Sequence, residues 1–450
     1  MFLATPAILA QLTTMMMQYI DASMVGSMGA EASASIGLME TTMWLLGSIC
    51  SATAAGFYVQ VSHQLGSNDP ARARSTLRQG IMSVLVVSAL LGLVSLAVSP
   101  FLPTWLGGNS HITPTASAYF AIVATALPIF QFSIFGAGML RSSGNMVVPS
   151  VMSVVMMSLD VVFNFFLIFP TRPVESFGTQ IMMPGMGLGV VGAAIGTVSA
   201  ELVAASITMY ILCFRSKELS LRIDTGRFLP TWGVVKRALH ISLPMGLQQT
   251  IMCSAYVMTT IIIAPLGTFA IAANSFGIII ESLCYMPGYG IADAATTLVG
   301  QSMGAGRHEL MKRFAWLSVG LGVTVMAVMG VVMYVGAPVA MAMMTPAEEV
   351  RRLGVEVLRI EAFAEPMFAA AIVSYGVFVG AAKTLVPSIM NLVSIWGVRI
   401  SLAAMLAPSM GLRGVWIAMC IELCFRGIIF LVKLKFWNIQ TSCKHYGKDQ

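Results

Sequence analysis

Acidic and amide side chains inside long apolar stretches are the residues of this chain that could bind an ion. Asp160 and Asn164 stand four positions apart, so in a helix their side-chain oxygens lie on one face. Thr197 adds a hydroxyl, and Ala193, one turn earlier, adds a backbone carbonyl if its helix is locally irregular. With Asp21 these groups are hard oxygen donors, which suit a small alkali cation or, between crowded carboxylates, a shared proton. We therefore predict that these five residues form one ion-coupling site.

Other acidic residues also fall in apolar stretches, where a charge costs about 2.5 to 3.5 kcal/mol on insertion scales and marks a functional candidate. They are Glu40, Glu201, Glu281, Asp293, Glu361, Glu365 and Glu422. We expect Glu361, Glu365 and Glu422 to lie near helix ends and to reach water. Glu281 is a candidate for contact with a cationic substrate, with an interhelical role as the alternative. Asp293 is a candidate for substrate contact, as a second proton-sensitive group or as a residue that faces a water-filled vestibule.

Methionines are abundant, with 35 in the chain, and their polarizable side chains suit a pocket that accepts different molecules. Most should be filler inside or around the helices. The best candidates for substrate contact are Met15, Met16, Met17 and Met24, because they share a predicted helix with Asp21, and we assign Met17 and Met24 to the substrate site.

The elements that must position these residues are membrane-spanning helices. The 450 residues are 57% hydrophobic and only 10% charged, whereas soluble chains carry about 25% charged residues. Each span needs ~20 apolar residues, and continuous apolar runs indicate helices rather than the alternating segments of a barrel. The first run continues past Asp21 into another, which is not typical of a cleaved signal peptide. Twelve apolar blocks are present, near residues 3–26, 33–64, 81–106, 115–139, 147–169, 187–213, 237–264, 269–301, 314–344, 355–379, 385–408 and 412–433.

Basic residues between these blocks predict the orientation. Eighteen Lys and Arg residues fall in alternate connections on one side, against four on the other, so the positive-inside rule places both termini in the cytoplasm. The net charge of +6 is therefore a topology signal, and we expect no nucleic-acid partner. We predict an amino-terminal lobe at 1–213, a cytoplasmic linker at 214–236, a carboxy-terminal lobe at 237–436 and a cytoplasmic tail at 437–450.

The chain also contains an internal repeat. A shift of 238 positions places Pro6 on Pro244, Pro128 on Pro366 and Pro149 on Pro387 without a gap. About 0.3 such coincidences are expected by chance, so the halves are related copies. Six spans in each half mean that both copies cross the membrane in the same direction, which is the parallel repeat of transporters. We predict an all-α integral membrane fold with twelve spans in two six-helix lobes and a central cavity.

Several segments resemble multidrug and toxic compound extrusion (MATE) transporters, from end to end of the chain. The first helix has Pro6 fifteen residues before Asp21 and then Met24-Val25-Gly26. Other matching segments read QLGSNDPARARSTLRQG (64–80), GMLRSSGNMVVPS (138–150), NSFGIIIESLCYMPGYGIADAATTLVGQSMGAGR (274–307) and NLVSIWGVRISLAA (391–404). The resemblance implies export of bulky, often cationic amphiphiles, driven by a sodium or proton gradient. We expect the protein to lie in the inner (plasma) membrane.

The resemblance also implies residue roles. Family members with an ion site in the amino-terminal lobe use positions that correspond to Asp21, Asp160, Asn164 and Thr197. The NorM-like members carry a Glu and an Asp in the other lobe, which correspond to Met252 and Phe368 here, so we expect the chain to be closer to the DinF-like branch. Two carboxylates in one dry site repel, so one is expected to hold a proton near neutral pH. Ion binding at Asp21 is then expected to bend the first helix at Pro6.

Two other functions remain as alternatives. A lipid-linked saccharide flippase of the same superfamily would need a strongly cationic cavity, for which Arg359 and Arg399 are the few candidates. A membrane enzyme would need clustered histidines, and the five present are scattered. We expect a monomeric transporter in the lipid bilayer that takes a small organic cation or amphiphile. It should need no cofactor other than H+ or Na+ as the coupling ion, and no other metal.

Overall fold

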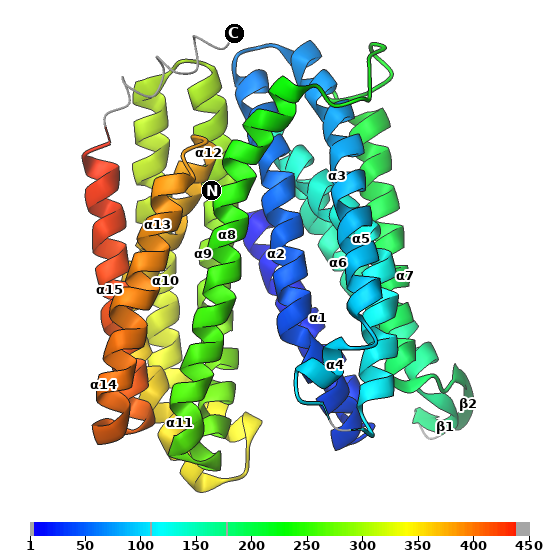
Figure 1. The fold of residues 1–450 in the computed structure, drawn as a ribbon, viewed down its shortest axis with the longest axis vertical. Coiled ribbons are helices and arrows are strands. Elements are labelled where there is room, and N and C mark those ends of the chain that lie inside the picture. Colours follow the sequence, from blue (N-terminus) through cyan, green and yellow to red (C-terminus); the bar gives the residue numbers. More distant parts are fainter. Residues whose placement is uncertain (1–3, 109, 177–178, 438–450) are drawn as a thin grey trace. The chain divides into compact units, whose positions relative to one another are not determined.

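The computed structural model describes residues 4–108, 110–176 and 179–437, most of which are helical (Figure 1). The elements in order are α1 (Ala4–Gly26), α2 (Ala30–Gly66), α3 (Pro70–Val98), α4 (Leu102–Trp105), α5 (Thr113–Ser142), α6 (Val147–Ile168), β1 (Pro170–Ser176), β2 (Thr179–Met186), α7 (Gly189–Tyr210), η1 (Ile211–Arg215), α8 (Trp232–Ile263), η2 (Ala264–Leu266), α9 (Thr268–Gly304), α10 (His308–Met344), α11 (Glu348–Glu361), α12 (Glu365–Gly380), α13 (Leu385–Val393), η3 (Ser394–Ile400), α14 (Ser401–Met410) and α15 (Leu412–Lys435).

The predicted all-α membrane fold is confirmed. Among the described residues, ten helices are long and apolar enough to span a membrane, and the bent pair α11 and α12 makes an eleventh. The remaining predicted block is α1, whose hydropathy is lowered by Gln11, Gln18 and Asp21. Some helices begin before their apolar block, as α3 does at Pro70, because charged turns at the membrane surface are also helical.

A short antiparallel hairpin between α6 and α7 was not predicted. Its strands β1 and β2 pair from Pro170 with Met186 to Ser176 with Thr179, with an irregularity between Pro170 and Arg172. The segment carries no long apolar run, so hydropathy identified it only as a connection between spans. The predicted tail lies outside the described residues from residue 438 onward.

The internal repeat is confirmed by the helix bounds. α9 begins and ends 238 positions after the corresponding ends of α2, and α10 begins 238 positions after the start of α3. The packing repeats as well. In the first copy α3 packs on α5 and α5 on α7, and in the second copy α10 packs on α12 and α12 on α15.

The two copies differ at one place. In the first, α5 continues through Pro128. In the second, the equivalent span is broken into α11 and α12, which meet at an angle of 58° just before Pro366. At this break the second copy has Glu361 and Glu365, whereas the first copy has Val123 and Leu127 at the positions 238 residues earlier.

The chain divides into two compact units. The described residues within 9–65 and 69–246 form the amino-terminal unit, and residues 4–8, 66–68 and 247–437 form the carboxy-terminal unit. The division falls inside α8, so the predicted linker, 214–236, belongs with the amino-terminal unit. Each unit has its own apolar core, which includes Leu77, Phe135 and Met139 in the first and Met326 and Trp416 in the second.

The linker is fixed to the start of α3 by buried arginines. Arg78 donates to the carboxylate and the backbone carbonyl of Asp224, and Nε of Arg74 donates to Oδ2 of Asp224 at 2.7 Å. The hydrogen bonds from Arg78 and Arg74 lower the pKa of Asp224 below its ordinary value. Oε1 of Gln79 accepts hydrogen bonds from the backbone and hydroxyl of Thr231. The linker is therefore held by charge-assisted contacts within its own unit.

Candidate ion-coupling site

Asp21 of α1 and the pair Asp160 and Asn164 of α6 meet through one amide group. Nδ2 of Asn164 donates to Oδ1 of Asp21 at 2.9 Å and to Oδ2 of Asp160 at 3.1 Å. The two carboxyl groups also interact with each other, and Thr197 of α7 interacts with Asp160. The structure therefore brings together four of the five predicted residues, from three helices of the amino-terminal unit.

The site holds oxygens that are not satisfied by the protein. Asp160 and Asn164 are 0% exposed, and Oδ1 of each has no hydrogen-bond partner among the described residues. A buried oxygen without a partner costs about 1 to 3 kcal/mol, and more when it is charged. Asp21 is partly exposed, so the site is closed on the α6 side and accessible on the α1 side. Such an arrangement is suited to reversible binding of a proton or a small monovalent cation.

Close helix packing sets the position of Asn164. Gly192 and Gly196 lie one turn apart on α7, which is the spacing that lets two membrane helices approach closely. A Cβ on Gly192 would lie 2.5 Å from the carbonyl oxygen of Leu167, and one on Gly196 would overlap Oδ1 of Asn164. The amide oxygen of Asn164 is thus packed against the backbone of α7 at Gly196.

Replacement of Gly196 by alanine should therefore displace Asn164 from the two carboxylates. Overpacking of this kind costs about 1 to 3 kcal/mol, and we expect gradient-driven dye efflux to fall roughly ten-fold, the factor that 1.4 kcal/mol represents. Gly37→Ala is the matched control, because a Cβ there meets nothing within 4 Å. Equal efflux rates for the two variants, at equal amounts of protein in the membrane, would contradict the proposed role of this contact.

Two further residues interact electrostatically with the site and were not predicted to belong to it. Tyr119 of α5 interacts electrostatically with Asp21 and Asp160. Glu201 of α7, one turn after Thr197, interacts with Asp160 and with Ser133. The spacing of Glu201 from Thr197 was a usable signal, whereas nothing in the sequence of α5 singles out Tyr119.

Other predicted residues lie apart from these contacts. Ala193 packs in an apolar cluster with Val25 and Ile168, and α7 is continuous around it. The predicted carbonyl ligand required an irregular helix, so the structure does not support Ala193 as part of the site. Met24 packs against the same cluster, and Met17 is partly exposed on α1. Neither methionine lines the pocket beside α11 that is described below.

The predicted hinge at Pro6 lies in the first turn of α1. α1 is continuous from Ala4 to Gly26. The boundary between the two compact units falls two residues later, between Ile8 and Leu9. The structure thus places Pro6 close to a boundary between units, in a helix that is not broken there.

The carboxy-terminal unit contains a second polar cluster, which the sequence did not predict. Glu361 and Glu365 are 0% and 1% exposed, and Glu422 is also fully buried. The expectation that these three side chains reach water is therefore wrong, because α9, α10 and α15 pack around them. Glu281 of α9 is buried in the same unit and interacts with Arg399 and Arg426.

Asp293 of α9 is less buried than these residues, and its backbone carbonyl accepts a hydrogen bond from Thr297 at 3.3 Å. The structure does not bring it into the hydrogen-bonded group around Glu422.

In that group Glu422 has a complete set of partners. Its Oε1 accepts from Ser394 at 2.5 Å and from Nε of Arg426 at 2.8 Å, and its Oε2 accepts from Arg426 at 2.7 Å. The guanidinium of Arg426 lies 5.6 Å from the centre of the Phe368 ring. Glu422 and Arg426 form a bidentate buried ion pair, one helical turn apart on α15.

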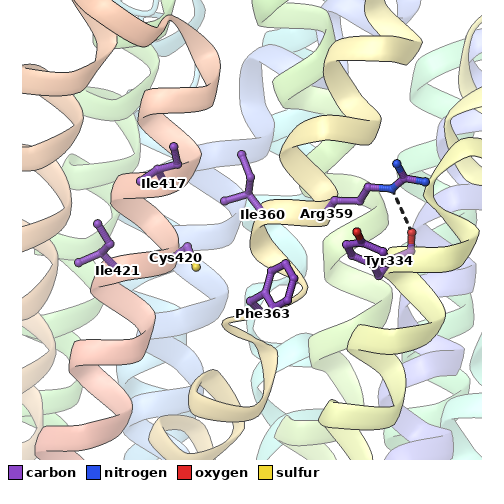
Figure 2. A pocket seen from close by; sticks show the side chains of 7 residues that line it. All are labelled: Tyr334, Arg359, Ile360, Phe363, Ile417, Cys420 and Ile421. Carbon is purple, nitrogen blue, oxygen red and sulfur yellow. Dashed lines mark hydrogen bonds between the residues drawn. The ribbon is translucent and has the colours of Figure 1, made fainter.

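A pocket of about 330 Å³ lies beside α11, between residues of α10, α11 and α15 (Figure 2). Its only charged lining residue is Arg359, whose Nε donates to the carbonyl oxygen of Tyr334 at 3.4 Å and whose guanidinium lies over the Tyr334 ring. The other lining residues are Ile360, Phe363, Ile417, Cys420 and Ile421. Glu361 does not line this pocket, although Cys420, which does, interacts electrostatically with Glu361.

Comparison with known proteins identifies the same two halves. The MatE family model matches residues 6–166 and again residues 244–405, together more than half of the chain. A probable multidrug resistance protein NorM from Thermotoga maritima is 24% identical over 435 residues, which are 96% of this chain and 90% of that protein. A protein of the same name from Chromobacterium violaceum is 26% identical over 456 residues, covering 100% of this chain and 94% of the relative.

Solved structures show the same fold. A MATE protein in complex with MaL6 superposes with a TM-score of 0.89 at 19% identity, over 98% of this chain and 96% of that chain. A MOP superfamily transporter from Pyrococcus furiosus superposes with a TM-score of 0.86 at 19% identity, over 96% and 94%. The curated relatives reported above carry the name NorM, so the expected DinF-like branch is not supported.

Proposed function

Because this chain belongs to the MatE family, we propose that it is an antiporter that exports bulky, often cationic amphiphilic molecules in exchange for H+ or Na+. It is a membrane transporter and not an enzyme. The substrate class is proposed from the relatives, which are named multidrug resistance proteins. The exchange mechanism is proposed from the polar residues of the amino-terminal unit.

One observation carries the proposal of ion coupling. A single amide group of Asn164 links two carboxylates, while Oδ1 of Asp160 and Oδ1 of Asn164 are buried without a partner. In a polar contact that serves only to hold helices together, each buried oxygen is expected to have a hydrogen-bond partner. Carboxylates left short of partners inside the membrane are instead typical of ion and proton pathways.

The residues present fit either coupling ion. Asp21 and Asp160 would supply the negative charge, and Asn164 Oδ1 and the hydroxyl of Thr197 would supply further oxygen. A bound cation would neutralise the charge of the two carboxylates. The protein holds these groups on α1, α6 and α7, so a change of charge acts on the packing of three helices at once.

The ion site is proposed for the amino-terminal unit and not for the positions used by NorM-like members in the other half. Met252 packs against an apolar cluster of Ala255, Ile395 and Ile400. Phe368 packs edge to face on Tyr285, with ring centres 5.5 Å apart. Neither residue can coordinate a cation through a carboxylate.

The contacts of Arg359 and Arg399 do not favour the flippase alternative, which needs these arginines in a cationic cavity. Arg359 donates to a backbone carbonyl of α10, and Arg399 lies against the sulfur of Met419. Both are engaged within their own unit. We further propose that the protein is a monomer in the inner (plasma) membrane. The excess of basic residues in alternate connections supports the placement of both termini in the cytoplasm.

Dye efflux from reconstituted vesicles tests the function. The protein is incorporated into liposomes loaded with ethidium, and a pH gradient and a sodium gradient are imposed separately. Under at least one of the two gradients, we expect efflux that is faster than in protein-free vesicles. This efflux should stop when an ionophore collapses the gradient. Efflux that is equal to that of protein-free vesicles under both gradients, for several cationic dyes, would overturn the proposal.

A further inference from the structure

The break between α11 and α12 places two carboxyl groups in the interior of the carboxy-terminal unit. Glu361 is the last residue of α11 and Glu365 the first of α12, and the helices meet there at 58°. Interrupted helices at membrane depth are tolerated where they line a cavity or a binding site. In the first copy of the repeat, the equivalent positions are Val123 and Leu127 in an unbroken helix, so the acidic groups are particular to the second copy.

Neither carboxyl group has a partner. All four oxygens of Glu361 and Glu365 are buried without a hydrogen bond in the described structure. A buried carboxylate without compensation costs several kcal/mol, which is far more than a buried neutral acid costs. Glu422, equally buried, shows the contrast, because Ser394 and Arg426 satisfy it.

The described groups around the break supply no hydrogen bond that could neutralise either carboxyl group. The titratable and charged groups that interact with the two carboxyls are Glu281, Cys284 and Tyr285 of α9, Arg399 of η3, and Cys420, Glu422 and Cys424 of α15. Of the nearby arginines, Arg399 contacts Met419 and Arg426 is paired with Glu422. The third, Arg359, donates a hydrogen bond to the backbone carbonyl of Tyr334 (Figure 2). None of the three donates a hydrogen bond to Glu361 or Glu365.

The space around the break restricts what could neutralise these groups. Gly330 of α10 packs so closely that a Cβ would lie 2.8 Å from the carbonyl oxygen of Ala362 and 3.2 Å from Cβ of Glu365. No set of three or more His, Cys, Asp or Glu residues in the described ranges could hold a metal ion. A proton needs no added volume and no ligand cage, so it can neutralise a carboxyl group at this packed break.

We propose that Glu361 and Glu365 bind and release protons during the transport cycle, as a second proton-loading point in the carboxy-terminal unit. The step is the association of H+ with a carboxylate oxygen to give a neutral carboxylic acid, and its reversal. Charged and neutral forms favour different packing at the break, because a charged pair must gain water or separate. Loading therefore biases the angle between α11 and α12. The inference rests on the proposed antiport and adds a second site to it.

Infrared spectroscopy tests the proton directly. Purified wild-type protein that carries isotope-labelled glutamate is titrated, so that the carbonyl band of protonated glutamic acid is separated from that of aspartic acid. We expect a protonated-glutamate band near neutral pH that decreases as pH rises and that is reduced in Glu361→Gln and Glu365→Gln. Glu309→Gln, at the exposed start of α10, is the control and should leave the band unchanged. A band absent from the wild type, or unchanged in both variants, would overturn the inference.

Transport measurements separate this inference from the proposed function. The variants Glu361→Gln and Glu365→Gln should still exchange ethidium across the vesicle membrane when its concentration is equal on both sides. Such exchange requires a folded substrate site but no net proton movement. Efflux driven by a pH gradient should fall roughly ten-fold, as for a loss of 1.4 kcal/mol. Normal gradient-driven efflux in both variants would refute the second loading point and leave the antiporter intact. Absence of gradient-driven efflux in the wild type would refute the antiporter itself.

Discussion

Gradient-driven ethidium efflux should fall to about the level of protein-free vesicles when Asp21 is replaced by asparagine. Oδ1 of the new amide can still accept the hydrogen bond from Asn164, so the contact between α1 and α6 should be kept. The negative charge is lost, and a charged hydrogen-bonded group is worth roughly 3 kcal/mol. That corresponds to a fall of about 100-fold in ion binding. Efflux from liposomes under imposed pH and sodium gradients is the measurement.

Two comparisons make the Asp21 result specific. Asp160→Asn removes the other carboxylate and should also abolish coupling, whereas Glu31→Gln, exposed at the start of α2, should not. Ethidium exchange without a gradient should persist in Asp21→Asn, since it needs no ion movement. Wild-type efflux in Asp21→Asn would remove this residue from the mechanism.

The largest effect on stability is expected at the buried ion pair of α15. Replacement of Glu422 alone by leucine leaves Arg426 buried without its partner, and breaking such a pair costs about 3 to 5 kcal/mol. Arg426→Leu should be similarly damaging. The double replacement removes both charges, and apolar substitution of a buried pair is often neutral or stabilising. The unfolding temperature of the detergent-solubilised protein should therefore fall strongly in each single variant and recover in the double variant.

An exposed pair in the same unit provides the control. Arg413 and Glu356 are joined at 2.6 Å but are substantially exposed, and such pairs contribute roughly 0 to 1 kcal/mol. Glu356→Leu should thus change the unfolding temperature little. If the double variant at Glu422 and Arg426 were as unstable as either single variant, the network with Ser394 would be essential in a way that the pair alone does not explain.

Hydropathy and the repeat predicted most of the fold. The twelve blocks follow from composition, because the bilayer requires long apolar helices whatever their partners. The bounds of α2 and α9 repeat at the shift of 238 that the prolines indicated. The pair Asp160 and Asn164 was also predictable, because a spacing of four residues fixes two side chains on one helix face.

The amino-terminal site was only partly predictable from the residues. Contact between Asp21 and Asn164 joins residues 143 positions apart, and the resemblance to a known family suggested it before the structure did. Gly196 and Tyr119 were not identified, because their roles depend on which helices approach closely. Ala193 was predicted from a condition that the regular α7 does not meet.

The sequence by itself determined the solvent, the spans and the duplication, because each of these depends on local hydrophobicity or on self-similarity. Only the tertiary structure decided the environment of Glu361, Glu365 and Glu422. An acidic residue near a helix end reaches water or becomes buried according to what packs beside it, and that is set by α9, α10 and α15. Glu422 has an arginine one turn away on its own helix, whereas the same packing left the two carboxyl groups at the helix break without a hydrogen-bond partner among the described residues.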